Sequence, residues 1–171
     1  MRTALIFFLL ASPALAQNGA AATAALSACG PADVKFDVNM DQTQPVTEPP
    51  TGKALVYMIE DGGQGTEFGG ITVRVGLDGA WIGANKENSY FTFSVSPGEH
   101  HLCSNWQSGL KTFAVYHSLA SFTAEAGKIY YFRARFLGWG RESRLDLDEI
   151  NGDEGRYLVS TSSLSVSHPK K

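Results

Sequence analysis

The chain has 171 residues, of which 43% are hydrophobic and 18% charged, and its formal net charge at pH 7 is −3. This length fits one domain rather than two of ordinary size. The apolar content, with ten Phe, six Tyr and three Trp, excludes a largely disordered chain. The acidic balance argues against nucleic acid as a partner, because proteins that bind it carry a surplus of basic residues. We therefore expect a single folded domain.

The first sixteen residues have the features of a secretory signal peptide. Arg2 supplies a positive charge, an apolar run follows from Ala4 to Ala11, and Ala14-Leu15-Ala16 has the small-x-small pattern of a cleavage site. The apolar run is too short to span a bilayer. The sequence therefore predicts export to the periplasm or the medium, with cleavage after Ala16.

The two cysteines, Cys29 and Cys103, leave three interpretations open. In an oxidising compartment an even number of cysteines most simply forms a disulfide, which is the arrangement we expect. Alternatively, Leu26-Ser27-Ala28-Cys29 has the form of a lipobox, in which Cys29 would be acylated and the protein anchored to a membrane. Residues 17–19 interrupt the apolar run that should lead into a lipobox. The third interpretation is two unpaired thiols.

The N-terminal part of the mature chain, residues 17–51, is rich in Ala and Pro, and we expect it to be flexible. An edge strand is predicted at 33–38, where Val34, Phe36 and Val38 alternate with polar residues. This segment therefore leads into the folded domain.

Residues 52–165 predict an all-β fold, a single antiparallel β-sandwich of about eight or nine strands. Alternating apolar residues and turn signals recur along this region about every eight to twelve residues. One short helix is predicted within 151–160, capped by Asn151 or Asp153. The tail, 166–171, is expected to be frayed.

The dipeptide Asp78-Gly79 predicts a hairpin with a two-residue turn. Such a turn places Gly76 opposite Trp81, with Arg74 near the indole ring. It also brings the apolar residues of the two strands to one face, in three pairs: Leu77 with Ala80, Val75 with Ile82, and Val73 with Ala84. A second turn is predicted at Ser96-Pro97-Gly98, with a return strand to Trp106 that carries a bulge.

The segment Ile129 to Phe136 predicts a strand that pairs with 145–149 across a loop centred on Trp139-Gly140. Its apolar residues lie on one face, and Tyr131 and two arginines lie on the other. The predicted register sets Arg133 opposite Asp148 and Arg135 opposite Asp146, with Ala134 opposite Leu147 and Phe136 opposite Leu145. We expect a structural charge ladder, and this reading is simpler than a calcium loop because Ile150 falls on a ligand position.

Five short motifs in this order resemble an uncharacterised bacterial family called domain of unknown function 2846. The motifs are Gly52-Lys53-Ala54-Leu55-Val56-Tyr57, Leu77-Asp78-Gly79, Asn88-Ser89-Tyr90-Phe91, Val95-Ser96-Pro97-Gly98-Glu99-His100 and Ala126-Gly127-Lys128-Ile129-Tyr130-Tyr131. The Pro-Gly-x-His turn is also similar to small envelope sandwich modules of the PEGA kind. The resemblance covers roughly residues 52–160. It implies a bacterial envelope protein with a sandwich fold, and it implies no chemistry.

The histidines are the best candidates for a metal site, and the sequence gives them little support. His100 and His101 are adjacent on a predicted strand, so they point to opposite faces and cannot bind one ion together. A site would need one of them joined by His117 and a distant carboxylate. We therefore expect no metal and no cofactor.

An aromatic and basic set, Arg74, Trp81 and Tyr131, is the candidate binding surface. Tyr and Trp beside Arg favour contacts with proteins or sugars. The alternative is that Trp81 covers Gly76 and packs on the stem of Arg74.

Two functional hypotheses follow from the sequence. The first is an exported, non-catalytic protein that binds a protein partner or an envelope glycan. The second is a metal-dependent or hydrolytic envelope enzyme that uses His100 or His101 with nearby carboxylates. The first is favoured because no catalytic motif accompanies the signal peptide.

Overall fold

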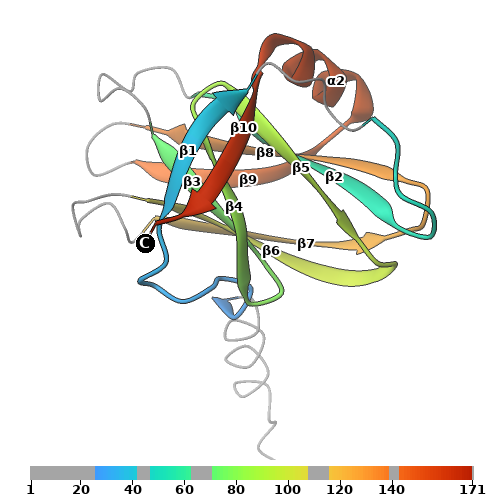
Figure 1. Ribbon diagram of the computed structural model, residues 1–171, viewed down its shortest axis with the longest axis horizontal. Helices are drawn as coiled ribbons and strands as arrows, with labels where there is room; N and C mark the ends of the chain where they lie inside the picture. The colour runs from blue at the N-terminus through green and yellow to red at the C-terminus, as the bar shows by residue number, and fades with distance from the viewer. Residues whose placement is uncertain (1–25, 42–46, 63–70, 108–115, 139–142, 171) are drawn as a thin grey trace, which may run out of the picture.

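The computed structural model describes residues 26–41, 47–62, 71–107, 116–138 and 143–170. The predicted signal peptide and its cleavage site lie outside these residues, as does the predicted loop at Trp139-Gly140. Within the described residues, ten strands, rather than the eight or nine expected, and one short C-terminal helix form the predicted all-β sandwich (Figure 1). The strands are β1 (Phe36–Asp41), β2 (Ala54–Glu60), β3 (Thr72–Leu77), β4 (Ala80–Lys86), β5 (Ser89–Val95), β6 (Gly98–Trp106), β7 (His117–Ala124), β8 (Ile129–Leu137), β9 (Arg144–Ile150) and β10 (Ser163–Pro169), and the helix is α2 (Gly152–Thr161).

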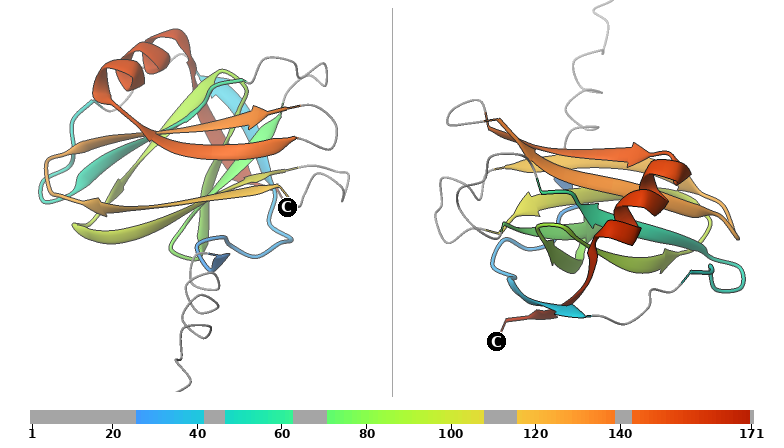
Figure 2. Two further views of the ribbon diagram at one scale, coloured as in Figure 1. Left: turned by 180° about the vertical axis from the view of Figure 1, so that it is seen from behind. Right: turned by 90° about the horizontal axis from the view of Figure 1, so that it is seen from above.

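The strands are divided between two sheets that pack face to face (Figure 2). The order in the six-stranded sheet is β1-β10-β5-β2-β8-β9, and the order in the four-stranded sheet is β4-β3-β6-β7. The main core lies between them and includes Met58, Val73, Leu102 and Phe132. Each comes from a strand whose side chains on this face are apolar, so the period of two in the sequence fills the core.

The helix α2 covers the outer face of the six-stranded sheet. Asn151 caps it, because its side-chain oxygen accepts hydrogen bonds at 3.0 Å from the backbone N–H groups of Asp153 and Glu154. Gly155 faces the sheet, where an added Cβ would lie 2.2 Å from the ring of Tyr131. The glycine therefore allows the helix to approach the sheet closely.

The register of β8 with β9 is the predicted one. Arg133 lies opposite Asp148, Arg135 opposite Asp146, and the apolar pairs Ala134–Leu147 and Phe136–Leu145 are also in place. Alternation of apolar and charged residues in the centre of both strands excludes a one-residue shift, which would turn the apolar side chains to the other face.

The hairpin of β3 and β4 begins as predicted and then departs from the prediction. Leu77 pairs with Ala80 and Gly76 with Trp81, but Val75 lies opposite Gly83 rather than Ile82. Val73 accordingly lies opposite Asn85 rather than Ala84. Ile82 is thus left without a partner in β3 and forms a β-bulge, which bends β4. Beyond the bulge β4 contacts β10, where the Ala84 N–H donates to the Ser167 hydroxyl at 3.1 Å.

The predicted turn at Ser96-Pro97-Gly98 does not close a hairpin. β5 belongs to the six-stranded sheet and pairs with β2, whereas β6 belongs to the four-stranded sheet and pairs with β3 and β7. The chain crosses between the layers at Pro97, and Gly98 adopts a φ of 136°, which favours glycine.

The tail predicted to be frayed is largely strand. β10 pairs with β1 over six residue pairs, from Phe36 with Pro169 to Asp41 with Leu164. β1 itself begins at Phe36, three residues later than the predicted edge strand. Two contacts in this sheet, β2 with β8 and β10 with β5, are parallel, so the sandwich is not antiparallel throughout.

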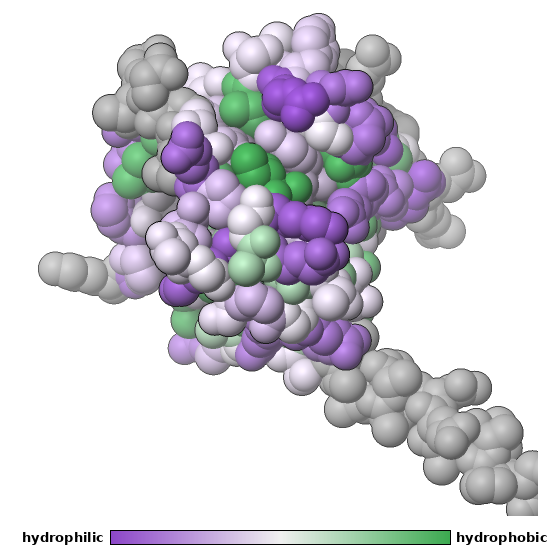
Figure 3. Space-filling model, turned by 90° about the vertical axis from the view of Figure 1, so that its right-hand side faces the viewer, coloured by the Kyte–Doolittle hydropathy of each residue, from purple (hydrophilic) through white to green (hydrophobic). Residues whose placement is uncertain are grey.

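Large hydrophobic side chains are mostly covered in the described part of the chain. The face drawn in Figure 3 has small hydrophobic areas set among hydrophilic residues. The exposed large hydrophobic residues within the described ranges are Leu26, Met40, Ile129 and Tyr157, which lie in four different segments. Isolated exposures of this kind are ordinary on a folded domain.

Candidate binding site beside strand β1

One side of β1 is paired with β10, and the other side is an edge. The Lys170 N–H donates to the Lys35 carbonyl at 2.8 Å, so the backbone of Lys35 faces β10. Backbone groups of successive residues in a strand point to alternate sides. The N–H and C=O groups of Phe36 and Val38 therefore point away from β10.

The side-chain amide of Gln107 fills the first position along this edge. Its Oε1 accepts a hydrogen bond from the Phe36 N–H at 2.6 Å, and its Nε2 donates to the Phe36 carbonyl at 2.8 Å. These are the two bonds that a residue of a neighbouring strand would make. Among the described residues, no group takes the corresponding place beside Val38.

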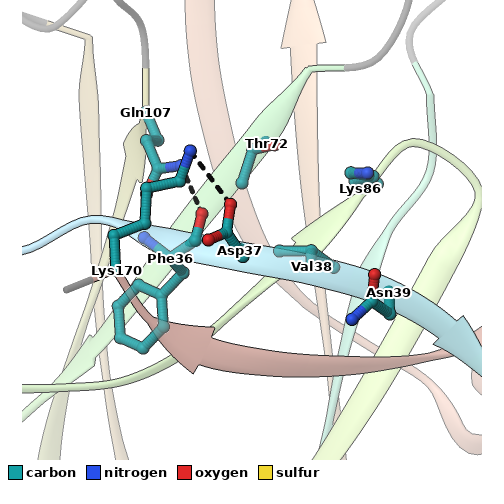
Figure 4. A pocket seen from close by; sticks show the side chains of 8 residues that line it. All are labelled: Phe36, Asp37, Val38, Asn39, Thr72, Lys86, Gln107 and Lys170. Carbon is teal, nitrogen blue, oxygen red and sulfur yellow. Dashed lines mark hydrogen bonds and ion pairs between the residues drawn. The ribbon is translucent and has the colours of Figure 1, made fainter.

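A pocket of about 540 Å³ opens beside this edge (Figure 4). Its lining comes from β1, β3, β4 and the residues that follow β6 and β10. The polar side chains that line it are Asp37, Asn39, Thr72, Lys86, Gln107 and Lys170. Lys170 Nζ lies 3.0 Å from the Asp37 carboxylate. Lys86 has no ion-pair partner among the described residues, and its side chain lines the pocket.

Arg74 and Trp81, two of the three predicted surface residues, are held beneath the N-terminal segment instead. The Arg74 guanidinium lies 4.3 Å from the Trp81 ring centroid, as the sequence predicts. Arg74 is 6% exposed, and it donates to the Asn105 side chain and to the carbonyls of Ala32 and Val34. Its hydrogen-bonding groups therefore serve the chain itself and do not form an open surface.

The N-terminal segment is fastened to the four-stranded sheet by further contacts. Cys29 and Cys103 form the predicted disulfide, across 74 residues of sequence. The Gly79 N–H donates to the Ala28 carbonyl at 3.2 Å, and Trp81 Nε1 donates to the Pro31 carbonyl at 2.7 Å. The disulfide uses the sulfur of Cys29 that acylation would require, so the two modifications exclude each other in one molecule.

Tyr131, the third predicted surface residue, lies in the other sheet. It is 7% exposed beneath α2, and its ring stacks on Tyr57 with 4.9 Å between centroids. The structure therefore separates Tyr131 from Arg74 and Trp81, and the predicted aromatic and basic surface is not formed.

The charged residues of β8 and β9 make different ion pairs from those predicted. Arg135 lies 3.5 Å from Asp148, the diagonal neighbour of its register partner. Arg133 instead pairs with Glu154 of α2, and Asp146 lies 3.0 Å from Arg144. The register is correct, but α2 supplies a carboxylate that the two strands alone do not reveal.

His100 is bound to the hairpin turn. Its Nδ1 lies 2.6 Å from the Asp78 carboxylate and its Nε2 lies 2.8 Å from the Ser96 carbonyl. Burial alone would lower the pKa of His100, but these bonds, together with the negative charge of Asp78, raise it above its ordinary value. Both ring nitrogens are thus engaged in the fold.

His117 lies at the other end of the β6–β7 pair. It pairs with Asn105, five residues along β6 from His100, which at about 3.3 Å per residue separates the two by roughly 17 Å. His101 Nε2 lies 3.9 Å from Glu99. In the described ranges, no three His, Cys, Asp or Glu side chains are arranged to hold a metal ion.

Glu60 is a buried carboxyl group that the sequence analysis does not single out. It ends the apolar strand β2 and is 1% exposed, and neither of its oxygens makes a well-formed hydrogen bond in the described structure. Burial, reinforced by the charges of Glu87 and Asp61, raises the pKa of Glu60 to about 8. The signal in the sequence is a single acidic residue at the end of an otherwise apolar run.

Comparison with known families identifies the chain. The sequence model of a family described as "Protein of unknown function (DUF2846)" matches residues 50–141, which is more than half of the chain. The chain belongs to the DUF2846 family. No curated protein and no solved structure matches it.

The DUF2846 match divides the candidate site. Thr72, Lys86 and Gln107 lie within the matched residues, whereas β1 and Lys170 lie outside them. The same holds for the disulfide, because Cys103 is within the match and Cys29 precedes it. The pocket is therefore built partly from the DUF2846 region and partly from the two flanking segments that pair as β1 and β10.

Proposed function

We propose that this protein is exported and acts as a non-catalytic binding module of the bacterial envelope, with its ligand bound in the pocket beside β1. The observation that carries the proposal is the pocket itself, about 540 Å³ of polar-lined space along the edge of β1, where no described strand pairs with it. The lining offers amides, a hydroxyl and ammonium groups, which bind a protein partner or an envelope glycan by hydrogen bonds.

Export is supported by two features of the chain. The first is the signal peptide pattern of residues 1–16, and the second is the disulfide, which persists in oxidising compartments. In the ranges that the structure describes, none of the helices has the length and apolar character needed to cross a membrane.

The intact mass of the protein from its native host tests export. We expect a mass that begins at Gln17 and rises by two hydrogens on reduction, because the disulfide is opened. A mass that begins at Cys29 and carries acyl chains would replace the proposal with a membrane-anchored lipoprotein. A mass that begins at Met1 would contradict export.

Photo-crosslinking in the native host tests the binding site. A photoreactive amino acid at the exposed Asn39 should give an adduct of defined mass, because Asn39 lines the pocket. The matched control carries the same amino acid at Tyr157, which is 66% exposed on α2 and does not line the pocket. No adduct at Asn39, or the same adduct at both positions, would contradict binding at this site.

A further inference from the structure

We propose that β1 binds an extended peptide as an additional strand, with an acidic side chain of that peptide directed toward Lys86. This inference rests on the proposed function, because it names the ligand class of the same pocket. It selects a polypeptide over a glycan. The argument uses the direction of the backbone groups, the position of Gln107 and the charges around the edge.

The backbone of β1 presents strand-like hydrogen-bonding groups to the pocket. Phe36 and Val38 point their N–H and C=O groups away from β10, and the pocket is lined by residues 36–39. A segment that lies in the pocket in an extended conformation meets a donor and an acceptor at Val38 with the spacing of a β-ladder. A glycan has no peptide backbone whose N–H and C=O groups could match this spacing.

Gln107 limits where an added strand can pair. Its amide already holds both backbone groups of Phe36, so the added strand cannot form a bonded pair there. The first position open to it is Val38. Gln107 therefore fixes the register of the added strand. If that strand moved two residues toward the start of β1, it would have to displace the Gln107 amide from Phe36.

The charges around the edge specify the side chains of the peptide. The residue bonded to Val38 directs its side chain to the same face as Val38, where Thr72 and Lys86 line the pocket. Its two neighbours lie beside the exposed Asp37 and Asn39. Asp37 is already paired with Lys170, and Asn39 is uncharged, so these flanking positions suit uncharged polar side chains. The partner best matched to these groups has an acidic residue at the central position, opposite Lys86.

Amide hydrogen exchange measured by NMR on the mature protein tests the inference. The probe is the peptide Thr-Thr-Thr-Glu-Thr-Val-Thr, blocked at both ends, and the matched control is Thr-Thr-Thr-Lys-Thr-Val-Thr. At about 1 mM peptide, we expect the Val38 amide to exchange at least about tenfold more slowly with the probe than with the control. The Phe36 and Asn39 amides should not change, because Gln107 and β10 already hold them.

Two variants separate this inference from a general effect on folding. Lys86→Glu should reverse the preference between the two peptides, since the central side chain then meets a negative charge. Gln107→Ala should allow the probe to slow exchange at Phe36 as well as at Val38, because the edge is then open one position further. The unchanged exchange pattern of β8 and β9 confirms that each variant is folded.

The outcomes distinguish this inference from the proposed function. No slowing at Val38 with the probe, or equal slowing with both peptides, overturns the inference. If an N-acetylglucosamine tetrasaccharide shifts the resonances of Thr72 and Lys86 without slowing Val38, the ligand is a glycan and only the proposed function stands. If neither peptide nor tetrasaccharide affects these resonances, both proposals fail.

Discussion

Glu60 makes the stability of the fold depend on pH. Between pH values of about 4.5 and 8 the folded protein keeps a proton on Glu60 that the unfolded chain has released. Because the folded state binds more protons in this range, the free energy of unfolding falls as the pH rises through it. The fall is on the order of 5 kcal/mol, since the two pKa values differ by about 3.5 and each unit of pKa corresponds to about 1.4 kcal/mol.

Denaturant unfolding at pH 5 and pH 8 checks this prediction. Glu60→Gln should remove most of the fall, because an amide does not ionise. Glu149→Gln serves as the control, since Glu149 is exposed on β9 and its replacement should leave the pH dependence in place. A wild-type protein that is equally stable at the two pH values would show that Glu60 ionises freely in the fold.

Single residues also explain why the site could not be read from the sequence. Gln107 and Phe36 are 71 positions apart, and the sequence around neither residue indicates that the Gln107 amide will bind the backbone groups of Phe36. Arg74 and Trp81 were predicted to meet, and they do. The sequence could not predict that Ala32 and Val34 would cover them, because those contacts depend on where the N-terminal segment lies.

Among the elements, β10 is the strand whose order the sequence underestimates. Its residues are Ser, Leu, Val, His and a final Pro, and two Lys follow them, so composition alone indicates a frayed end. The pairing with β1 overrides that local preference. By contrast, the register of β8 with β9 is predicted correctly, because apolar and charged residues alternate over the centre of both strands.

Amide exchange distinguishes an ordered β10 from a frayed tail. Val166 and His168 pair with Asn39 and Asp37 on the side of β10 that faces β1, so their N–H groups should exchange at least about a hundredfold more slowly than in an unfolded peptide. A short unstructured peptide with the sequence of residues 163–170 gives the fast reference. Rates at Val166 and His168 equal to those in this peptide would contradict the pairing.

At the scale of the whole molecule, the sequence predicted the two-layer architecture and not the path of the chain. The alternation of apolar and polar residues shows which side of a strand faces the core. Both sheets share one core, so the alternation does not show to which sheet a strand belongs. The turn at Pro97 illustrates this, because it joins two strands that look like hairpin partners and belong to different sheets. The disulfide was predictable because only two cysteines are present.

The disulfide should contribute to the stability of the entire fold. It closes 74 residues of sequence between the N-terminal segment and β6, which corresponds to about 4 kcal/mol in the chain-entropy description. Reduction should lower the free energy of unfolding by about that amount, as measured by urea denaturation with and without reductant. A double variant with serine at Cys29 and Cys103 should match the reduced protein and be insensitive to reductant. A wild type unaffected by reductant would contradict the bridge.

The pairing of β1 with β10 also sets the time at which the protein can finish folding. The first strand of the six-stranded sheet pairs only with residues 164–169, which lie far along the chain from residues 36–41. Until then β1 has no strand on either side, and closing so long a loop is slow. Completion of this sheet therefore waits for β10, and a chain that stops at a premature codon before β10 keeps β1 unpaired however well its central strands assemble.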